Sequence, residues 1–130
     1  MNAQEKMIEY QLKPRGIDDE SVLRAMAEVD RTMFVPDQIR DMAYADSALP
    51  IGKDQTISQP YIVAYMAQIL ETSPDHTVLE IGTGCGYNAA VLSRITEHVF
   101  SIEIIEWLGH LARKNLNKAG IKNVTTMIGD

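Results

Sequence analysis

The carboxyl-terminal half of the chain alternates short apolar runs with longer segments of helical period. In order, the pattern predicts a strand at 77–81, a helix at about 87–95, a strand at 98–103, a helix at about 105–119 and a strand at 124–128. Gly120 stands where a left-handed residue is expected to end the second helix. Strands that alternate with helices in this way indicate a parallel sheet with right-handed crossovers. We therefore predict an α/β fold.

The first third of the chain has the pattern of short amphipathic helices. Apolar residues recur at helical spacing before Pro14-Arg15-Gly16 interrupts the pattern, and again after Asp18 and Asp19, either of which could cap the second helix. Residues 46–58 are polar, contain Pro50 and Gly52, and show no sustained period. We predict that they form an extended loop, and a loop of this length usually has a function.

A third helix is predicted to begin at Ser58-Gln59-Pro60. The Ser58 hydroxyl can accept a backbone hydrogen bond at the cap, and Pro60 is tolerated in the first turn. The apolar residues that follow at helical spacing are expected to form the buried stripe of this helix: Ile62, Val63, Met66, Ile69 and Leu70.

Composition and charge exclude several classes of protein. The chain has 130 residues, 45% of them hydrophobic, which predicts one packed domain rather than a disordered segment. Its net charge of -6 argues against nucleic-acid binding. A lone cysteine, Cys85, and three widely spaced histidines predict neither a disulfide nor a metal site. No signal peptide or membrane span is visible, so we expect a cytoplasmic location without membrane partners.

The first predicted strand runs directly into a glycine-rich turn, Gly82-Thr83-Gly84-Cys85-Gly86, and a predicted helix follows. Glycines at such a junction let the backbone bend tightly and let a nucleotide-like ligand lie against it. The spacing is G-x-G-x-G preceded by Glu80, whereas the dinucleotide fingerprint has its third glycine one position later. A nucleophile elbow would need glycines where Thr83 and Tyr87 stand, so Cys85 is better explained as a small residue in a tight turn.

Two more acids follow the later strands. Glu103 ends the second strand, where a carboxylate can accept hydrogen bonds from both hydroxyls of a ribose, and Asp130 follows the third, where it could meet an adenine amino group. An alternative for Glu103 is an ordinary exposed residue at a strand end. Because parallel strands end at one edge, we expect Glu80, Glu103 and Asp130 to lie along a single rim.

Together these residues resemble the S-adenosylmethionine-dependent protein-L-isoaspartate O-methyltransferase family over essentially the whole chain. The matching stretches are Tyr10–Ile17, Phe34–Pro36, Ala48–Gly52, Gln55–Ala64 and Val78–Gly84. The resemblance implies a Rossmann-like methyltransferase fold with helices on both faces of a parallel sheet. It also implies methyl transfer to the α-carboxylate of L-isoaspartyl residues in damaged proteins or peptides. Cys85 and Asn88 depart from the serine and glutamine more usual in the family, with modest effects expected on cofactor packing.

The resemblance also suggests a division of the chain and a set of site residues. Residues 1–75 are expected to form a helical extension with a substrate-side loop, and residues 76–130 the first half of a cofactor-binding sheet that stops after its third strand. Ser58 is the expected catalytic residue, with the role of orienting the reacting carboxylate. The expected contacts of S-adenosylmethionine are Gln55, Thr56, Ile57, Ser58, Glu80, Gly82, Thr83, Gly84, Cys85, Gly86, Glu103 and Asp130.

Two alternatives stay open at this point. A nicotinamide-dependent oxidoreductase would keep the sheet and change the ligand. A truncated, non-catalytic fragment would keep the cofactor-binding turn without turnover, because three strands leave an unpaired sheet edge and uncovered apolar surface.

Overall fold

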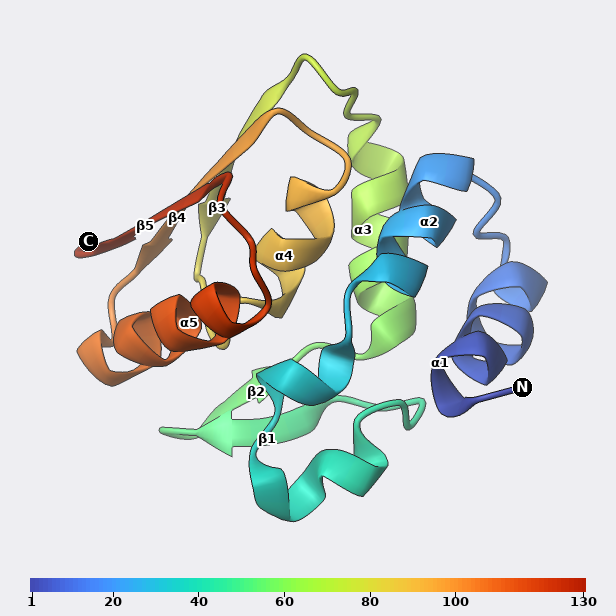
Figure 1. Cartoon of the computed structure of the whole chain (residues 1–130), viewed down its shortest axis with the longest axis horizontal. Helices are drawn as coiled ribbons and strands as arrows, with labels where there is room; N and C mark the ends of the chain where they lie inside the picture. Colours follow the sequence, from blue (N-terminus) through green and yellow to red (C-terminus); the bar gives the residue numbers. More distant parts are fainter.

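A three-stranded parallel sheet forms the carboxyl-terminal half of the computed structural model, which describes residues 1–130 (Figure 1). Its strands lie in the order β3-β4-β5 and are connected by helices α4 and α5. The bounds are β3 Thr77–Ile81, α4 Tyr87–Ser93, β4 His98–Glu103, α5 Glu106–Lys118 and β5 Val124–Ile128. All three strands begin and end at the predicted residues, and Gly120 has the predicted left-handed conformation, with φ of 71°.

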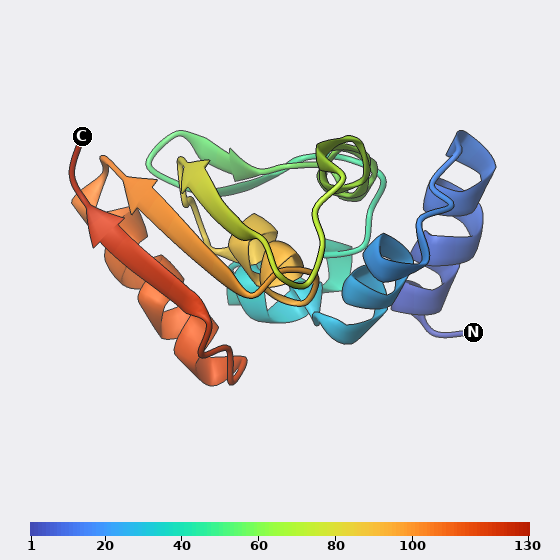
Figure 2. The ribbon, with the colours of Figure 1, turned by 90° about the horizontal axis from the view of Figure 1, so that it is seen from above.

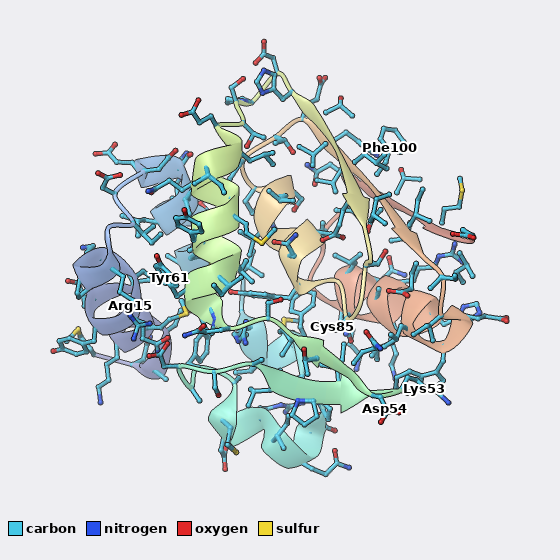
Figure 3. All side chains as sticks on the ribbon, turned by 180° about the vertical axis from the view of Figure 1, so that it is seen from behind. Arg15, Lys53, Asp54, Tyr61, Cys85 and Phe100 are labelled. Atoms are coloured by element: carbon cyan, nitrogen blue, oxygen red, sulfur yellow. The ribbon has the colours of Figure 1, made fainter.

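Both crossover helices pack on the same face of the sheet (Figure 2). Val99 and Ser101 of β4 point toward these helices and are buried. On the opposite face, Leu79 is 62%, Phe100 46% and Met127 59% exposed (Phe100 is labelled in Figure 3). The α/β class is confirmed, and within this chain only one face of the sheet is covered by helices.

The amino-terminal half consists of short helices. Helix α1 (Ala3–Lys6) continues as a π-helix over Met7–Leu12 and a 3-10 turn over Lys13–Arg15. Helix α2 (Glu20–Glu28) is capped by Asp19, whose side chain accepts from the amides of Ser21 and Val22, so one of the two predicted caps is confirmed. Two 3-10 segments follow, at Arg31–Phe34 and Asp37–Met42.

The prediction of an extended loop over residues 46–58 is wrong, because this segment contains a β-hairpin. Strands β1 (Leu49–Gly52) and β2 (Gln55–Ile57) pair antiparallel. The turn between them places Lys53 and Asp54 at φ of 56° and 58°, the left-handed conformation that a tight hairpin turn requires. Leu49, Ile51 and Ile57 are buried on the inner side of the hairpin.

Helix α3 (Pro60–Leu70) begins where predicted, but its buried face differs from the predicted stripe. Val63, Ala64 and Ala67 are buried against α2 and the π-helical segment. Ile62 is 38%, Met66 58%, Ile69 59% and Leu70 50% exposed. Small residues allow the close approach of neighbouring helices, so the larger apolar residues face outward.

A single hydrophobic core joins the two halves of the chain. It includes Met7 and Phe34 from the amino-terminal half and Tyr87 and Val99 from the α/β half. The rings of Phe34 and Tyr87 meet edge to face, with centroids 5.6 Å apart. This contact fixes the amino-terminal segments against the start of α4, next to the glycine-rich turn. No helix has the length and apolar character that a membrane crossing requires.

Candidate functional site

The glycine-rich turn has a backbone conformation that other residues rarely adopt. Gly82, Gly84 and Gly86 have φ of 93°, 56° and 94°. A Cβ at Gly86 would lie 3.3 Å from Cγ of Leu116, so this glycine serves the packing of α4 against α5. A Cβ at Gly82 would have no neighbour within 4 Å, which leaves that side of the turn open to a ligand.

The carboxylate of Glu103 holds the middle of this turn. One oxygen accepts from the backbone N–H of Gly84 at 2.7 Å and the other from the N–H of Ile105 at 3.0 Å. The residue is 6% exposed, so the alternative of an ordinary exposed strand-end residue is wrong. A carboxylate has about four lone-pair sites, so Glu103 can still accept hydrogen bonds from a ligand.

Glu80 is buried behind the turn and braces it. Its carboxylate accepts from the Ser101 hydroxyl at 2.5 Å and from the side-chain amide of Asn88 at 2.7 Å. Ser101 in turn shares a hydrogen bond of 2.6 Å with the hydroxyl of Thr83. Burial raises the pKa of Glu80, while the hydrogen bonds from Ser101 and Asn88 oppose that rise. These four side chains connect β3, the turn, α4 and β4.

The third predicted acid has a different environment. The backbone N–H of Gly129 donates to the carbonyl of Glu103 at 2.9 Å, which places the residues after β5 at the same sheet edge as the end of β4. Asp130 itself is exposed, and its side chain makes no hydrogen bond. Glu103 therefore contacts the turn directly and Glu80 is linked to it through Ser101 and Thr83, whereas Asp130 lies at the same edge without a hydrogen bond to the turn.

The hairpin and the glycine-rich turn meet at a small cavity of about 80 Å³. It is lined by Thr56, Ile57, Ser58, Val63, Gly82, Thr83, Gly84, Cys85, Tyr87 and Asn88. Seven residues predicted as cofactor contacts are thus brought together from segments far apart in the sequence. The other five predicted contacts lie outside this cavity: Gln55, Glu80, Gly86, Glu103 and Asp130. Of these, Glu80 lines a neighbouring cavity of about 400 Å³ together with Ser58, Gly82 and Asn88.

Ser58 does not cap helix α3. The cap position is occupied by Gln59, and no side chain provides a capping hydrogen bond, so this prediction is wrong. The Ser58 hydroxyl makes no hydrogen bond within the protein, whereas the Ser58 carbonyl accepts from Nη2 of Arg31 at 2.8 Å. The backbone of Ser58 is therefore fixed, and its exposed side chain is available to a ligand.

The hairpin is anchored at its tip and at its base; Figure 3 labels Lys53 at the tip and Arg15. At the tip, the Lys53 ammonium lies 5.6 Å from the ring centroid of Trp107. At the base, Asp46 accepts from Arg15 at 2.7 Å and from Gln59 at 2.8 Å. The hydrogen bond from Arg15 is the main reason that the pKa of Asp46 falls to about 2. These contacts hold the segment that carries Ser58 in place beside the glycine-rich turn.

Four residues at or beside the site are not among the expected cofactor contacts, although Asn88 was expected to influence cofactor packing: Arg31, Tyr87, Asn88 and Ser101. Ser101 and Glu103 are polar residues that alternate with apolar ones along β4, and this alternation was a signal that both face the turn. Asn88 lies in the first turn of the helix after the glycines, a position from which it can reach β3. Arg31 carried no such signal, because arginine is almost never fully buried without a partner.

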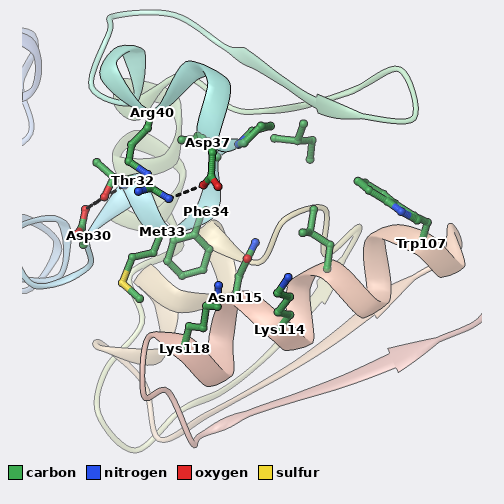
Figure 4. Close-up of a pocket in the computed structure, with 14 residues that line it drawn as sticks. Asp30, Thr32, Met33, Phe34, Asp37, Arg40, Trp107, Lys114, Asn115 and Lys118 are labelled. Atoms are coloured by element: carbon green, nitrogen blue, oxygen red, sulfur yellow. Dashed lines mark hydrogen bonds and ion pairs between the residues drawn. The ribbon is translucent and has the colours of Figure 1, made fainter.

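The largest cavity lies elsewhere, between residues 30–40 and α5 (Figure 4). Its volume is about 520 Å³, and none of the predicted site residues lines it. Arg40 forms an ion pair with Asp37 there, and Lys114 and Lys118 come from α5. Although it is larger, it is the weaker candidate, because neither the glycine-rich turn nor Glu80, Glu103 or Asp130 lines it.

The cysteine and the histidines provide no nucleophile or general base in the cavity at the turn. Cys85 is 3% exposed, and burial raises the pKa of its thiol to about 11, as suits a packing residue rather than a nucleophile. None of His76, His98 and His110 lines the cavity. The side chains that could bind a metal nowhere gather in a group of three or more.

Comparison with known proteins identifies the family. The family model for protein-L-isoaspartate(D-aspartate) O-methyltransferase matches residues 2–130. The protein-L-isoaspartate O-methyltransferase of Opitutus terrae is 53% identical over 129 residues, which are 99% of this chain and 55% of that protein. The enzyme of the same name from Picosynechococcus sp. is 48% identical over 97% of this chain and 57% of its own length. The chain thus spans about half the length of these relatives.

Solved structures agree with this assignment. A protein-L-isoaspartate O-methyltransferase superimposes with a TM-score of 0.88 at 32% identity, covering 98% of this chain and 42% of that protein. A Plasmodium falciparum protein in complex with S-adenosyl-L-homocysteine superimposes with a TM-score of 0.80 at 23% identity, a likeness of fold that covers 99% of this chain and 64% of that one. The chain belongs to the protein-L-isoaspartate(D-aspartate) O-methyltransferase family.

Proposed function

We propose that this chain forms the cofactor-binding part and one wall of the substrate site of an S-adenosylmethionine-dependent methyltransferase. The acceptor is the α-carboxylate of L-isoaspartyl residues in damaged proteins or peptides. The observation that carries this proposal is the cavity where Ser58 and its hairpin meet the glycine-rich turn. The family assignment supports it, because the relatives are named for this reaction.

The residues of the turn fit an adenosine-containing cofactor. The open space beside Gly82 allows a ligand to approach the backbone closely. Glu103 is fixed by Gly84 and Ile105 and retains free lone pairs for ribose hydroxyls. We assign Asp130 to the adenine end of the site, since it lies at the same edge of the sheet. S-adenosylmethionine, when bound, supplies a methyl group on a positively charged sulfur.

The proposed reaction needs no general base from this chain. A free α-carboxylate has a pKa of about 3.5, so the acceptor is ionised at neutral pH. Correct positioning of two reactants can contribute about 7 to 11 kcal/mol to lowering a barrier. We assign this positioning to Ser58, whose hydroxyl is free while its backbone is fixed by Arg31.

A radiolabelling experiment tests the proposed function. The purified protein is incubated with S-[methyl-³H]adenosylmethionine and either an isoaspartyl peptide or its normal aspartyl twin, and base-labile methyl ester is counted. We expect ester on the isoaspartyl peptide alone. Equal labelling of both peptides would refute the substrate assignment.

Calorimetry separates this function from its alternatives. We expect binding of S-adenosylhomocysteine and none of NAD; the reverse result would favour a nicotinamide-dependent oxidoreductase. Binding without labelling would identify a non-catalytic cofactor-binding fragment. This alternative is considered because the chain covers only 55% to 57% of the length of these relatives. For location we propose the cytoplasm, since the single cysteine is a buried free thiol.

A further inference from the structure

Arg31 is a fully buried cation without an anionic partner. Its exposed fraction is 0%, and none of the ion pairs in the structure includes it. Nε donates to the carbonyl of Ala43 at 2.5 Å and Nη2 to that of Ser58 at 2.8 Å, while Nη1 is buried and has no partner. The guanidinium carbon lies 4.9 Å from the ring centroid of Tyr87.

Such an arrangement is costly for a residue that serves packing alone. Removing a charge from water is costly, and an apolar side chain of similar volume is often at least as stable at a buried position. Desolvation lowers the pKa of Arg31, although its guanidinium is effectively always charged in proteins. The position of this charge therefore calls for an explanation beyond packing.

The charge lies directly behind the candidate site. The Arg31 guanidinium contacts the Ser58 carbonyl at the end of the hairpin and the Tyr87 ring in α4. Both of these residues line the 80 Å³ cavity. A charge in a buried position is screened only weakly by salt and water, so its potential extends into a neighbouring cavity. This positive potential stabilises an anionic ligand in the cavity.

We propose that Arg31 is a positioning residue that favours a carboxylate in the cavity between Ser58 and the glycine-rich turn. It acts in two ways: its hydrogen bond fixes the Ser58 backbone, and its uncompensated positive charge attracts the carboxylate. This inference rests on the proposed function, in which both the amino-acid part of the cofactor and the isoaspartyl acceptor carry a carboxylate.

The test compares ligands that differ only in a carboxylate. Calorimetry measures the affinity of wild-type protein and of Arg31→Met for S-adenosylhomocysteine and for its decarboxylated analogue, S-adenosyl-3-thiopropylamine. We expect Arg31→Met to weaken S-adenosylhomocysteine about tenfold and the analogue less than about twofold. In a second arm, with S-adenosylhomocysteine present, an isoaspartyl peptide is compared with its α-amide.

The two arms identify which carboxylate is favoured. A selective loss in the first arm assigns the effect to the cofactor, and a selective loss in the second assigns it to the acceptor peptide. Equal weakening of ligands with and without the carboxylate would reduce Arg31 to a structural role and overturn the proposal. Wild-type protein that binds no nucleoside would refute the proposed function and this inference together, a result distinct from failure of the variant alone.

Two further variants guard against a folding defect. Arg31→Lys retains a cation and is expected to keep the preference of wild type for the carboxylated ligand; loss of that preference in a folded Lys variant would contradict the role of the charge. Arg24→Met removes an arginine from the exposed side of α2, where the side chain is 63% exposed, and is expected to change no affinity.

Discussion

Glu103 accepts a hydrogen bond of 2.7 Å from the backbone N–H of Gly84, so the residue that ends β4 holds the turn that follows β3. The same carboxylate accepts from the N–H of Ile105. One side chain thus joins two strand ends at the edge where the candidate site lies. Its replacement should change both the stability of the turn and the binding of a ligand to it.

Glu103→Gln is expected to destabilise the protein by about 1 to 3 kcal/mol, because the amide nitrogen would face one of two backbone donors. The affinity for S-adenosylhomocysteine should fall with it. Urea unfolding and calorimetry measure the two effects. Glu106→Gln is the matched control, since that side chain is 79% exposed in the first turn of α5. Similar results for the two variants would contradict the proposed role of Glu103.

The stability contribution of Glu80 should depend on pH. Burial raises the folded pKa of Glu80 above its ordinary value of 4.5, so its contribution is fully present below that value and is lost as pH rises through the folded pKa. Glu80→Gln removes this dependence and can keep hydrogen bonds to Ser101 and Asn88. Relative to wild type, we expect the variant to gain stability as the pH rises from 4 to 8.

Unfolding in urea at several pH values measures this difference. Glu97→Gln, at an exposed position before β4, serves as the control and should follow wild type. A difference between Glu80→Gln and wild type that stays constant from pH 4 to pH 8 would show that the titration of Glu80 does not contribute.

Two glycine substitutions separate backbone strain from steric overlap. Gly16 and Gly52 have φ of 92° and 107°, so alanine is strained at both positions. A Cβ at Gly52 would lie 3.0 Å from Cζ3 of Trp107, whereas one at Gly16 would have no neighbour within 4 Å. We expect Gly16→Ala to cost about 1 kcal/mol and Gly52→Ala about 1 to 3 kcal/mol.

Tryptophan fluorescence reports on the same pair, because Trp107 is the sole tryptophan of the chain. Gly52→Ala should shift its emission and Gly16→Ala should not. An unchanged spectrum in Gly52→Ala would mean that the hairpin tip does not rest on Trp107.

Ser58→Ala should affect catalysis more than binding or stability. The hydroxyl makes no hydrogen bond within the protein, and the carbonyl that Arg31 holds is unchanged by the substitution. We expect a stability change within about 0.5 kcal/mol. Cofactor affinity should change less than about twofold, and labelling of an isoaspartyl peptide should fall at least about tenfold if the hydroxyl orients the acceptor. An unchanged labelling rate would remove Ser58 from the proposed mechanism.

The open face of the sheet should bind a hydrophobic dye. Ile81 is 76% exposed and lines the 400 Å³ cavity with Leu79 and with Ile62 and Met66 of α3. Ile81→Lys is expected to lower fluorescence of 8-anilinonaphthalene-1-sulfonate and to leave the urea midpoint nearly unchanged. Lys122→Ala, a solvent-exposed control, should alter neither quantity. Dye fluorescence that is equal in wild type and Ile81→Lys would contradict the exposure of this face.

The strands and helices of the α/β half were predictable because strand-like and helical periods alternate along it, with Gly82 directly after β3 and Gly120 shortly after α5. The hairpin was not, because Lys53-Asp54 lacks the Asn-Gly type of signal that marks such a turn. For α3, a helical period of apolar residues does not say which side meets a neighbour. Two alanines, Ala64 and Ala67, decided that contact by their small volume.

The candidate site was predictable where chemistry and position along a strand coincide. Glu80 and Glu103 stand near strand ends on either side of a glycine-rich turn in the sequence. Glu103 accepts a hydrogen bond from Gly84 in that turn, and Glu80 accepts one from Asn88 just after it. Arg31 lies far from these residues in sequence, between Asp30 and Thr32, and its burial follows from long-range packing against Ala43, Ser58 and Tyr87. Long-range packing of this kind leaves no local pattern to read.

The alternation of side chains along β4 links the proposed cofactor site to strand pairing. Ser101 and Glu103 face the same side, and a shift by one residue would replace them with Phe100 and Ile102. A mispaired sheet would therefore lose both attachments of the turn at once. A nucleoside that binds at the turn would bind only to molecules with the native strand pairing. Its presence during refolding is therefore expected to increase the fraction of molecules in the correct register by mass action.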